Sequence, residues 1–168
     1  MGFEIQPAWY ASINPLVIII FAPLFALLWT KLGSRQPSIL FKMSLGLWLA
    51  FFGFGLLAVA FTFTGSALVS PLWVVGGISL MTLGELMLSP TGLSAATLLA
   101  PQRHMSKMMS LWFVSNALGQ GIIAVTVRFF DSAAPQNFYL AFAVVALVVG
   151  GILFATRHKL TDLAKGIR

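Results

Sequence analysis

Five long apolar segments constrain the fold of this chain more than any other feature. Each is close to the roughly 20 mainly apolar residues that a helix needs to cross a bilayer. An open sheet edge cannot lie in lipid, and the strict alternation of a membrane-barrel strand is absent. We therefore predict an all-α membrane protein with five transmembrane helices, over about residues 7–29, 43–64, 71–90, 108–127 and 138–156.

The composition agrees with this prediction and excludes a soluble domain. Hydrophobic residues make up 59% of the chain and charged residues only 8%, whereas a soluble domain is about a quarter charged. Because such a small number of charged residues cannot cover a water-facing surface, we expect the lipid bilayer to surround the protein. The length of 168 residues fits one domain and no repeat or linker divides it. Residues 1–168 are therefore expected to form a single helical bundle.

Basic residues are clustered in the short links between the apolar segments. Nine of the ten lie on one side of a five-pass path: Lys31, Arg35, Lys42, Arg103, Lys107, Arg157, Lys159, Lys165 and Arg168. Such asymmetry is a topology signal of membrane proteins and argues against a nucleic-acid-binding protein. It predicts a multi-pass protein of the plasma membrane with its N-terminus outside and its C-terminus in the cytoplasm. An odd number of spans that begins outside without a signal peptide indicates the C-terminal part of a longer protein.

The sequence gives no support for an enzyme. The chain has no cysteine, and its two histidines, His104 and His158, lie in basic links. No histidine shares a span with a serine, so a nucleophile–base pair has no support. Metal-binding and phosphate-binding motifs are absent as well. We therefore predict no catalytic residue, no metal site and no cofactor.

Glu85 is the most unusual residue of the sequence, because it lies well inside the third apolar segment, in "GELMLSP". An ionisable side chain near the middle of a bilayer costs roughly 2.5–3.5 kcal/mol on insertion scales. Such residues therefore face a cavity or a partner. No basic residue lies inside any apolar segment of this chain. The partner of Glu85 is then expected to be a ligand, a proton or a segment outside this chain.

Two further features of the third segment extend this candidate site. Ser89 and Gly92 follow Glu85 by four and seven residues, on the same helical face. Pro90 has no amide hydrogen, and it is expected to bend or break the helix there. Pro90 and Gly92 alone would favour a plain packing kink. Next to Glu85 they favour a binding site, because transporters build such sites on interrupted helices.

Asn14 and a polar stripe in the fourth segment are the remaining candidates. If the first helix begins at Asn14, the side chain is an N-cap before Pro15. If the helix begins at Pro7, Asn14 lies about two turns inside and is able to face a polar cavity, and the pattern leaves both alternatives open. The stripe consists of Trp112, Ser115, Asn116, Gly119 and Gln120, which share one helical face. For Ser115, Gly119 and Gln120 we favour packing between helices.

These residues resemble a known family, the proton-dependent oligopeptide transporters of the major facilitator superfamily. The segment "GELMLSPTGLSAATLLAP" followed by "MMSLWF" is similar to the family's tenth and eleventh helices, and "PAWYASINPLVIIIFAPLFALLWTKLGSRQPS" to the eighth helix and its loop. The resemblance implies helices eight to twelve of a twelve-helix transporter, with the first helix starting at Pro7. It places Asn14 and Glu85 in the central cavity near the amino end of the peptide. Ser89 would lie one turn below Glu85, Trp112 would border a side-chain pocket, and Asn116 would lie one turn from Trp112.

The resemblance also shows what the chain does not contain. The family's first-helix Glu-x-x-Glu-Arg motif is absent, as are the basic residues of the first half. We therefore expect the C-terminal fragment of a proton-coupled symporter for di- and tripeptides, in which Glu85 takes part in proton coupling. Because alternating access needs a second bundle, the chain is not expected to transport without the missing N-terminal helices. The alternative is a non-transporting membrane remnant or assembly partner of a transporter. Nitrate or another solute also stays open as the substrate.

Overall fold

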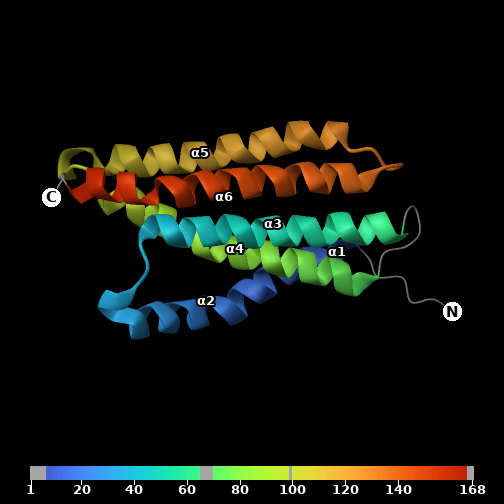
Figure 1. Ribbon diagram of the computed structural model, residues 1–168, viewed down its shortest axis with the longest axis horizontal. Coiled ribbons are helices and arrows are strands. Elements are labelled where there is room, and N and C mark those ends of the chain that lie inside the picture. Colours follow the sequence, from blue (N-terminus) through green and yellow to red (C-terminus); the bar gives the residue numbers. More distant parts are fainter. Residues whose placement is uncertain (1–6, 65–69, 99, 166–168) are drawn as a thin grey trace.

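The protein is a bundle of long helices in the computed structural model, which describes residues 7–64, 70–98 and 100–165 (Figure 1). The elements are α1 (Pro7–Ala11), α2 (Ile13–Leu32), η1 (Gly33–Arg35), α3 (Ile39–Thr64), α4 (Pro71–Leu98), η2 (Gln102–His104), α5 (Met105–Thr126), η3 (Val127–Phe129) and α6 (Pro135–Lys165). No strand occurs in these ranges. Five helices are long and apolar enough to cross a membrane, which confirms the predicted all-α fold.

The start of the first span decides between the two alternatives for Asn14. Helix begins at Pro7 and is interrupted at Ser12, and α2 continues from Ile13. The interruption has a local cause: Pro15 has no amide hydrogen, so the carbonyl group of Ala11 lacks its usual donor. Asn14 therefore lies inside the helical span and is not its N-cap. This agrees with the start at Pro7 that the family resemblance favours.

The third span differs from its predicted form. Helix α4 begins at Pro71, directly after Ser70 as predicted, but it continues through Pro90 to Leu98. The helix thus extends beyond the predicted span of about residues 71–90, and Pro90 does not break it. A single proline removes one backbone hydrogen bond, which neighbouring helices in a membrane bundle compensate. The uncharged link at residues 65–69, the first six residues and Arg168 lie outside the described residues.

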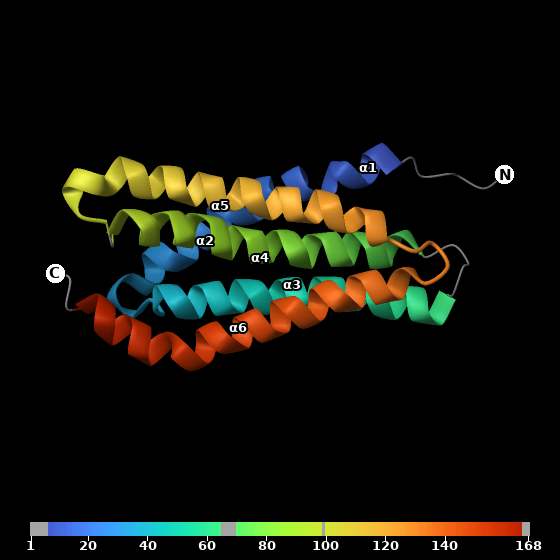
Figure 2. The ribbon, with the colours of Figure 1, turned by 90° about the horizontal axis from the view of Figure 1, so that it is seen from above.

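Helices α3, α4 and α6 form the core of the bundle, and α2 and α5 are attached to it through α4. Helix α3 packs extensively on both α4 and α6, whereas α2 and α5 pack mainly on α4. Although α5 and α6 overlap in Figure 1, Figure 2 shows them on opposite sides of the α3–α4 pair. In α2 only Val17 is buried, and no side chain described in α5 is buried. These two helices therefore expose most of their surface.

Paired glycines bring the backbones of α3 and α4 into contact. A Cβ atom added to Gly46 would lie 2.8 Å from the carbonyl oxygen of Gly84, and one added to Gly84 would lie 2.5 Å from that of Gly46. Two turns away, a Cβ atom on Gly53 would lie 2.8 Å from the carbonyl oxygen of Gly77. Small residues at such crossings allow close helix packing, which replaces the hydrophobic effect inside lipid.

Aromatic side chains hold α6 against the other face of α3. The rings of Phe61 and Tyr139 stack with centroids 5.4 Å apart, and those of Phe54 and Phe142 at 5.5 Å. Further along, Gly150 of α6 makes room for the indole of Trp48, since a Cβ atom there would lie 2.9 Å from its Nε1. The two faces of α3 are thus packed differently, by glycines against α4 and by rings against α6.

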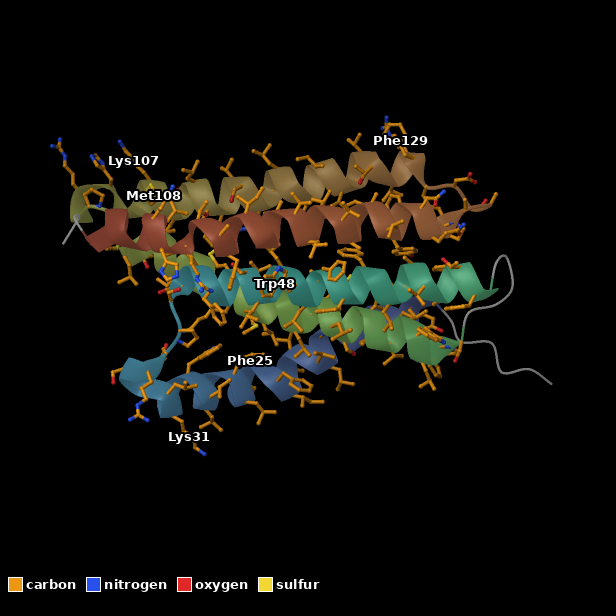
Figure 3. All side chains as sticks on the ribbon, in the orientation of Figure 1. Phe25, Lys31, Trp48, Lys107, Met108 and Phe129 are labelled. Atoms are coloured by element: carbon orange, nitrogen blue, oxygen red, sulfur yellow. The ribbon has the colours of Figure 1, made fainter. Side chains whose placement is uncertain are left out.

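The described basic residues gather at one end of the bundle, with the exception of Arg128. The α2–α3 link, the α4–α5 link and the last turns of α6 lie together at this end (Figure 1). Figure 3 shows Lys31 and Lys107 there and Phe129 at the opposite end. We call it the basic end. The predicted one-sided distribution of charge is therefore present in the structure, at Lys31, Arg35, Lys42, Arg103, Lys107, Arg157 and Lys159.

The glycine contact yields a stability prediction. The substitution Gly84→Ala is expected to lower the free energy of unfolding by about 1–3 kcal/mol, because the added methyl group overpacks a backbone contact. The matched control is Gly55→Ala on α3, where a Cβ atom would meet nothing within 4 Å. Thermal unfolding in detergent, followed by circular dichroism, measures both. Equal melting temperatures for the two variants would contradict the close α3–α4 packing.

Candidate functional site

The candidate site lies where α2 crosses α4, and it is built around the amide of Asn14. Its Nδ2 atom donates one hydrogen bond to Oγ1 of Thr82, at 3.1 Å, and one to Oε2 of Glu85, at 3.2 Å. Asn14 is far in the sequence from both Thr82 and Glu85, and the crossing of α2 and α4 brings it to them. The structure therefore joins two predicted site residues, Asn14 and Glu85, through a direct contact.

Thr82 fixes the orientation of the Asn14 amide. Its side chain is 1% exposed, and its hydroxyl donates to the carbonyl oxygen of Ile78 at 2.8 Å. Because a hydroxyl has a single hydrogen, Oγ1 of Thr82 is left to accept from Asn14. The ionised carboxylate of Glu85 also only accepts. Both neighbours therefore require the NH₂ group of Asn14 on their side, and the oxygen Oδ1 of Asn14 is left as an acceptor for another group.

The packing of α4 on α3 turns Glu85 toward the open side of the helix. Gly84 faces α3 and is buried, whereas the next residue, Glu85, is exposed in the described structure. In the described part of the chain, Asn14 is the hydrogen-bond partner of Glu85, and no basic side chain forms an ion pair with it. The neutral amide satisfies one carboxylate oxygen but leaves the negative charge uncompensated. The site therefore presents an uncompensated negative charge that is suited to a cation.

Ser89 lies further along α4 toward the basic end, and Trp112 of α5 contacts α4 on the same side. Ser89 is exposed one turn after Glu85. The indole of Trp112, on α5, lies directly on Gly92: a Cβ atom added there would overlap Cη2 of the ring and lie 2.5 Å from Cζ3. Gly92 therefore makes room for Trp112, and this contact attaches α5 to α4. Glu85 and Ser89 thus follow one another along α4, and Trp112 of α5 lies against the next turn of that helix, at Gly92.

Asn116 has a different surrounding from the other candidates. Its Nδ2 atom donates to the carbonyl oxygen of Trp112 at 2.9 Å, and the hydroxyl of Ser115 donates to the same oxygen at 2.7 Å. Both polar groups are thus turned back onto their own helix. Asn116 is exposed and makes no described contact with Asn14 or Glu85. The structure therefore places it beside Trp112 without joining it to the Asn14–Glu85 pair.

Thr82 and Gly92 are the site residues that sequence reasoning missed or read differently. Threonine is common in apolar helices, and only its spacing of three residues from Glu85 marks Thr82 as a neighbour on the same face. Gly92 was placed on that face and, next to Glu85, was interpreted as part of a binding site, but its contact with the Trp112 ring was not foreseen. In the ranges that the structure describes, no group of three or more His, Asp or Glu residues is placed to hold a metal ion.

Comparisons with known proteins agree on one family. The model of the POT family matches residues 1–145. An uncharacterized transporter of Bacillus subtilis, YclF, is 43% identical over 166 residues, which are 99% of this chain and 34% of the relative. A di-/tripeptide transporter of Lactococcus lactis subsp. cremoris is 35% identical, again over 99% of this chain and 34% of the relative.

Solved structures give the same result. The crystal structure of a peptide transporter POT in complex with sulfate superposes with a TM-score of 0.90 and 45% identity, over 96% of this chain and 33% of that one. A POT family transporter in complex with a thioalcohol-conjugated peptide superposes with a TM-score of 0.84 and 37% identity, over 89% of this chain and 31% of that one. The chain thus spans about a third of the length of the proteins it matches.

The packing of Trp112 on Gly92 can be tested by fluorescence. The test uses a version in which the other four tryptophans are replaced by phenylalanine. In this version, Gly92→Ala is expected to displace the indole and to change its emission maximum and its quenching by acrylamide. The control is Gly119→Ala on α5, where a Cβ atom would meet nothing within 4 Å. An unchanged spectrum in the Gly92→Ala variant would show that the ring does not lie on Gly92.

Proposed function

Because the chain belongs to the POT family, we propose that it is the C-terminal part of a proton-coupled symporter for di- and tripeptides. The observation that carries this proposal is the Asn14–Glu85 hydrogen bond on the open side of α4. A carboxylate inside a membrane span is costly unless a cation or proton meets it. Relatives and structural neighbours that are named as peptide transporters support the substrate class.

Glu85 is proposed to bind the ammonium group of the peptide and to change its protonation state or its partner during the transport cycle. An ammonium near the carboxylate stabilises the ionised form, since an opposite charge within about 4–6 Å favours it. A carboxylate that only swapped the ammonium for the proton would exchange the two across the membrane. Symport therefore also needs a proton-carrying group elsewhere, which we place in the helices outside this chain. No resident cofactor takes part in this step, and the proton acts as the coupling ion.

Asn14 is proposed to orient the peptide. Thr82 and Glu85 engage its two amide hydrogens, and this leaves Oδ1 to accept a hydrogen bond from the ammonium group. The ammonium would then lie between a carboxylate and an amide oxygen. Because Thr82 is buried and bonded to the backbone of α4, it holds the amide in place before the peptide arrives. Such preorganisation lowers the entropy cost of binding.

Trp112, Ser89 and Asn116 are proposed to contact the rest of the peptide. Trp112 presents an aromatic surface that is suited to an apolar side chain, and Ser89 presents a hydroxyl one turn below Glu85. Asn116 lies on the same side of α5 as Trp112. Its internal hydrogen bond leaves the side-chain oxygen to accept from the peptide.

Transport is proposed to require further helices beside this chain. Alternating access depends on one bundle moving against another around a central site. Helices α2 and α5 flank α4 with exposed faces, and the chain spans about a third of its relatives. We infer that the remaining helices cover these faces and complete the site. In the plasma membrane the basic end would face the cytoplasm, in agreement with the positive-inside rule.

Uptake measurements with a chimera test this function. The 168-residue chain is joined to the preceding helices of the Lactococcus lactis di-/tripeptide transporter and reconstituted in vesicles with an imposed pH gradient. We expect uptake of a labelled dipeptide by the chimera and none by the chain alone. Glu85→Gln should abolish proton-driven uptake, because a neutral amide neither attracts the ammonium group by charge nor takes up a proton.

Two further variants sharpen the test. Asn14→Leu should raise the KM for the dipeptide about tenfold, as expected for one lost hydrogen bond to a charged group. Asp131→Asn is the matched control, since it neutralises a carboxylate in the exposed α5–α6 link and should leave uptake unchanged. Full proton-driven uptake by the Glu85→Gln chimera would exclude the proposed role of Glu85. A chimera that inserts but never transports would favour a non-transporting remnant or assembly partner.

A further inference from the structure

A cavity separates α2 from α3 and α4 near the basic end, away from the Asn14–Glu85 site. Helix α2 diverges from α3 and α4 toward this end (Figure 1), and a cavity of about 350 Å³ lies between them. The cavity is large enough for a small molecule or part of a lipid.

The lining of this cavity changes from apolar to polar along the bundle. Helices α2 and α4 both run toward the basic end, and they contribute Phe25 and Leu86 further inside the span. Nearer the basic end the wall consists of Trp29, Lys42 and Ser94, together with Gln36 and Thr91. An occupant that matches this lining has an apolar part inside the membrane and a polar part at its edge.

Lys42 supplies a fixed positive charge at the polar end of the cavity. Its Nζ atom lies 4.2 Å from the ring centroid of Trp29 and donates to Oε1 of Gln36 at 2.8 Å. Gln36 is held in turn by a hydrogen bond from its Nε2 atom to the carbonyl oxygen of Trp29, at 2.7 Å. Lysine has three donors, and in the described residues no carboxylate pairs with this one. The charge is therefore positioned by neutral groups and is suited to an anionic ligand.

We propose that this cavity binds an anionic phospholipid of the leaflet at the basic end. The headgroup phosphate contacts Lys42 and the hydroxyls of Thr91 and Ser94, and one acyl chain lies against Phe25 and Leu86. Basic pockets between transmembrane helices at the cytoplasmic surface bind such headgroups. Trp29 lies near the basic end of α2, as expected for a tryptophan at the membrane–water interface. Free phosphate fits less well, because it leaves the apolar part of the cavity without a partner.

The lipid would act as a structural wedge for α2. This helix packs mainly on α4 and makes few contacts with α3. An acyl chain in the gap fills space that would otherwise cost packing energy. Because α2 also carries Asn14, the lipid would hold the helix that positions half of the candidate site.

Quenching of Trp29 by brominated lipids tests the proposal without any transport assay. The test uses the 168-residue chain with its other four tryptophans replaced by phenylalanine. It is reconstituted in phosphatidylcholine vesicles that contain brominated phosphatidylglycerol or, at equal mole fraction, brominated phosphatidylcholine. We expect an apparent affinity for the anionic lipid that is about fivefold higher, as one basic residue near the surface provides. Equal quenching by the two lipids would overturn the proposal.

Matched variants separate a specific site from general attraction to the surface. Lys42→Gln should reduce the preference for phosphatidylglycerol to about onefold, and Lys42→Arg should retain it. Lys31→Gln is the control. Lys31 lies in the last turn of α2 at the basic end, is exposed and points away from the bundle (Figure 3). A loss of preference in Lys31→Gln equal to that in Lys42→Gln would contradict a specific site.

Two more measurements keep the outcome unambiguous. Circular dichroism of each variant establishes that its helices are intact, so that a lost preference reports on Lys42 and not on unfolding. The preference is also measured in the chimera with the Lactococcus lactis helices. If the preference disappears there, a side chain of the added helices occupies the polar end of the cavity, and the lipid assignment is wrong. Since no uptake is measured, failure of this proposal leaves the proposed transport function untouched.

Discussion

The contact of α3 with α4 through two pairs of glycines determines how the rest of the structure is arranged. It commits one side of α4 to the core, at Gly77 and Gly84, and so leaves the opposite side for Thr82 and Glu85 to meet α2. Helix α6 does not need this surface, because it packs on α3 through aromatic rings. Both peripheral helices, α2 and α5, are therefore positioned by α4. A single helix connects the core to every residue of the candidate site.

The chemistry of the candidate site depends on the pairing of the charged Glu85 with the neutral side chain of Asn14. An amide donor lowers the cost of placing a carboxylate inside a membrane span, but it does not cancel the charge. A lysine or arginine in the place of Asn14 would form a closed ion pair and leave little reason for a ligand to bind. Asn14 instead keeps Glu85 oriented and still reactive toward cations. The same logic applies at the basic end, where Gln36 and Trp29 hold Lys42 without neutralising it.

Local sequence patterns predicted the features that depend on lipid, and failed for those that depend on helix crossings. The five spans and the unusual position of Glu85 follow from hydropathy, because a bilayer penalises every exposed charge. The proximity of Asn14 to Glu85 came from the family resemblance, since the residue pattern left two positions for the start of the first helix. Three contacts depend on the angles between helices: Thr82 with Asn14, Trp112 with Gly92, and Lys42 with Trp29. The periodicity of a sequence does not specify these angles. The sequence pattern allowed a break at Pro90, but α4 continues through it, because neighbouring helices compensate for the missing hydrogen bond.

The order of packing has a consequence for how the chain is made. The aromatic face of α3 packs on α6, which is the last of these helices to be synthesised. Phe54 therefore cannot contact Phe142 until two intervening helices have been made. At about 5–20 residues per second, this interval lasts roughly 4–18 seconds. During that time the ribosome has delivered α4 and α5 to the membrane, and the ring-lined surface of α3 is still without its native neighbour.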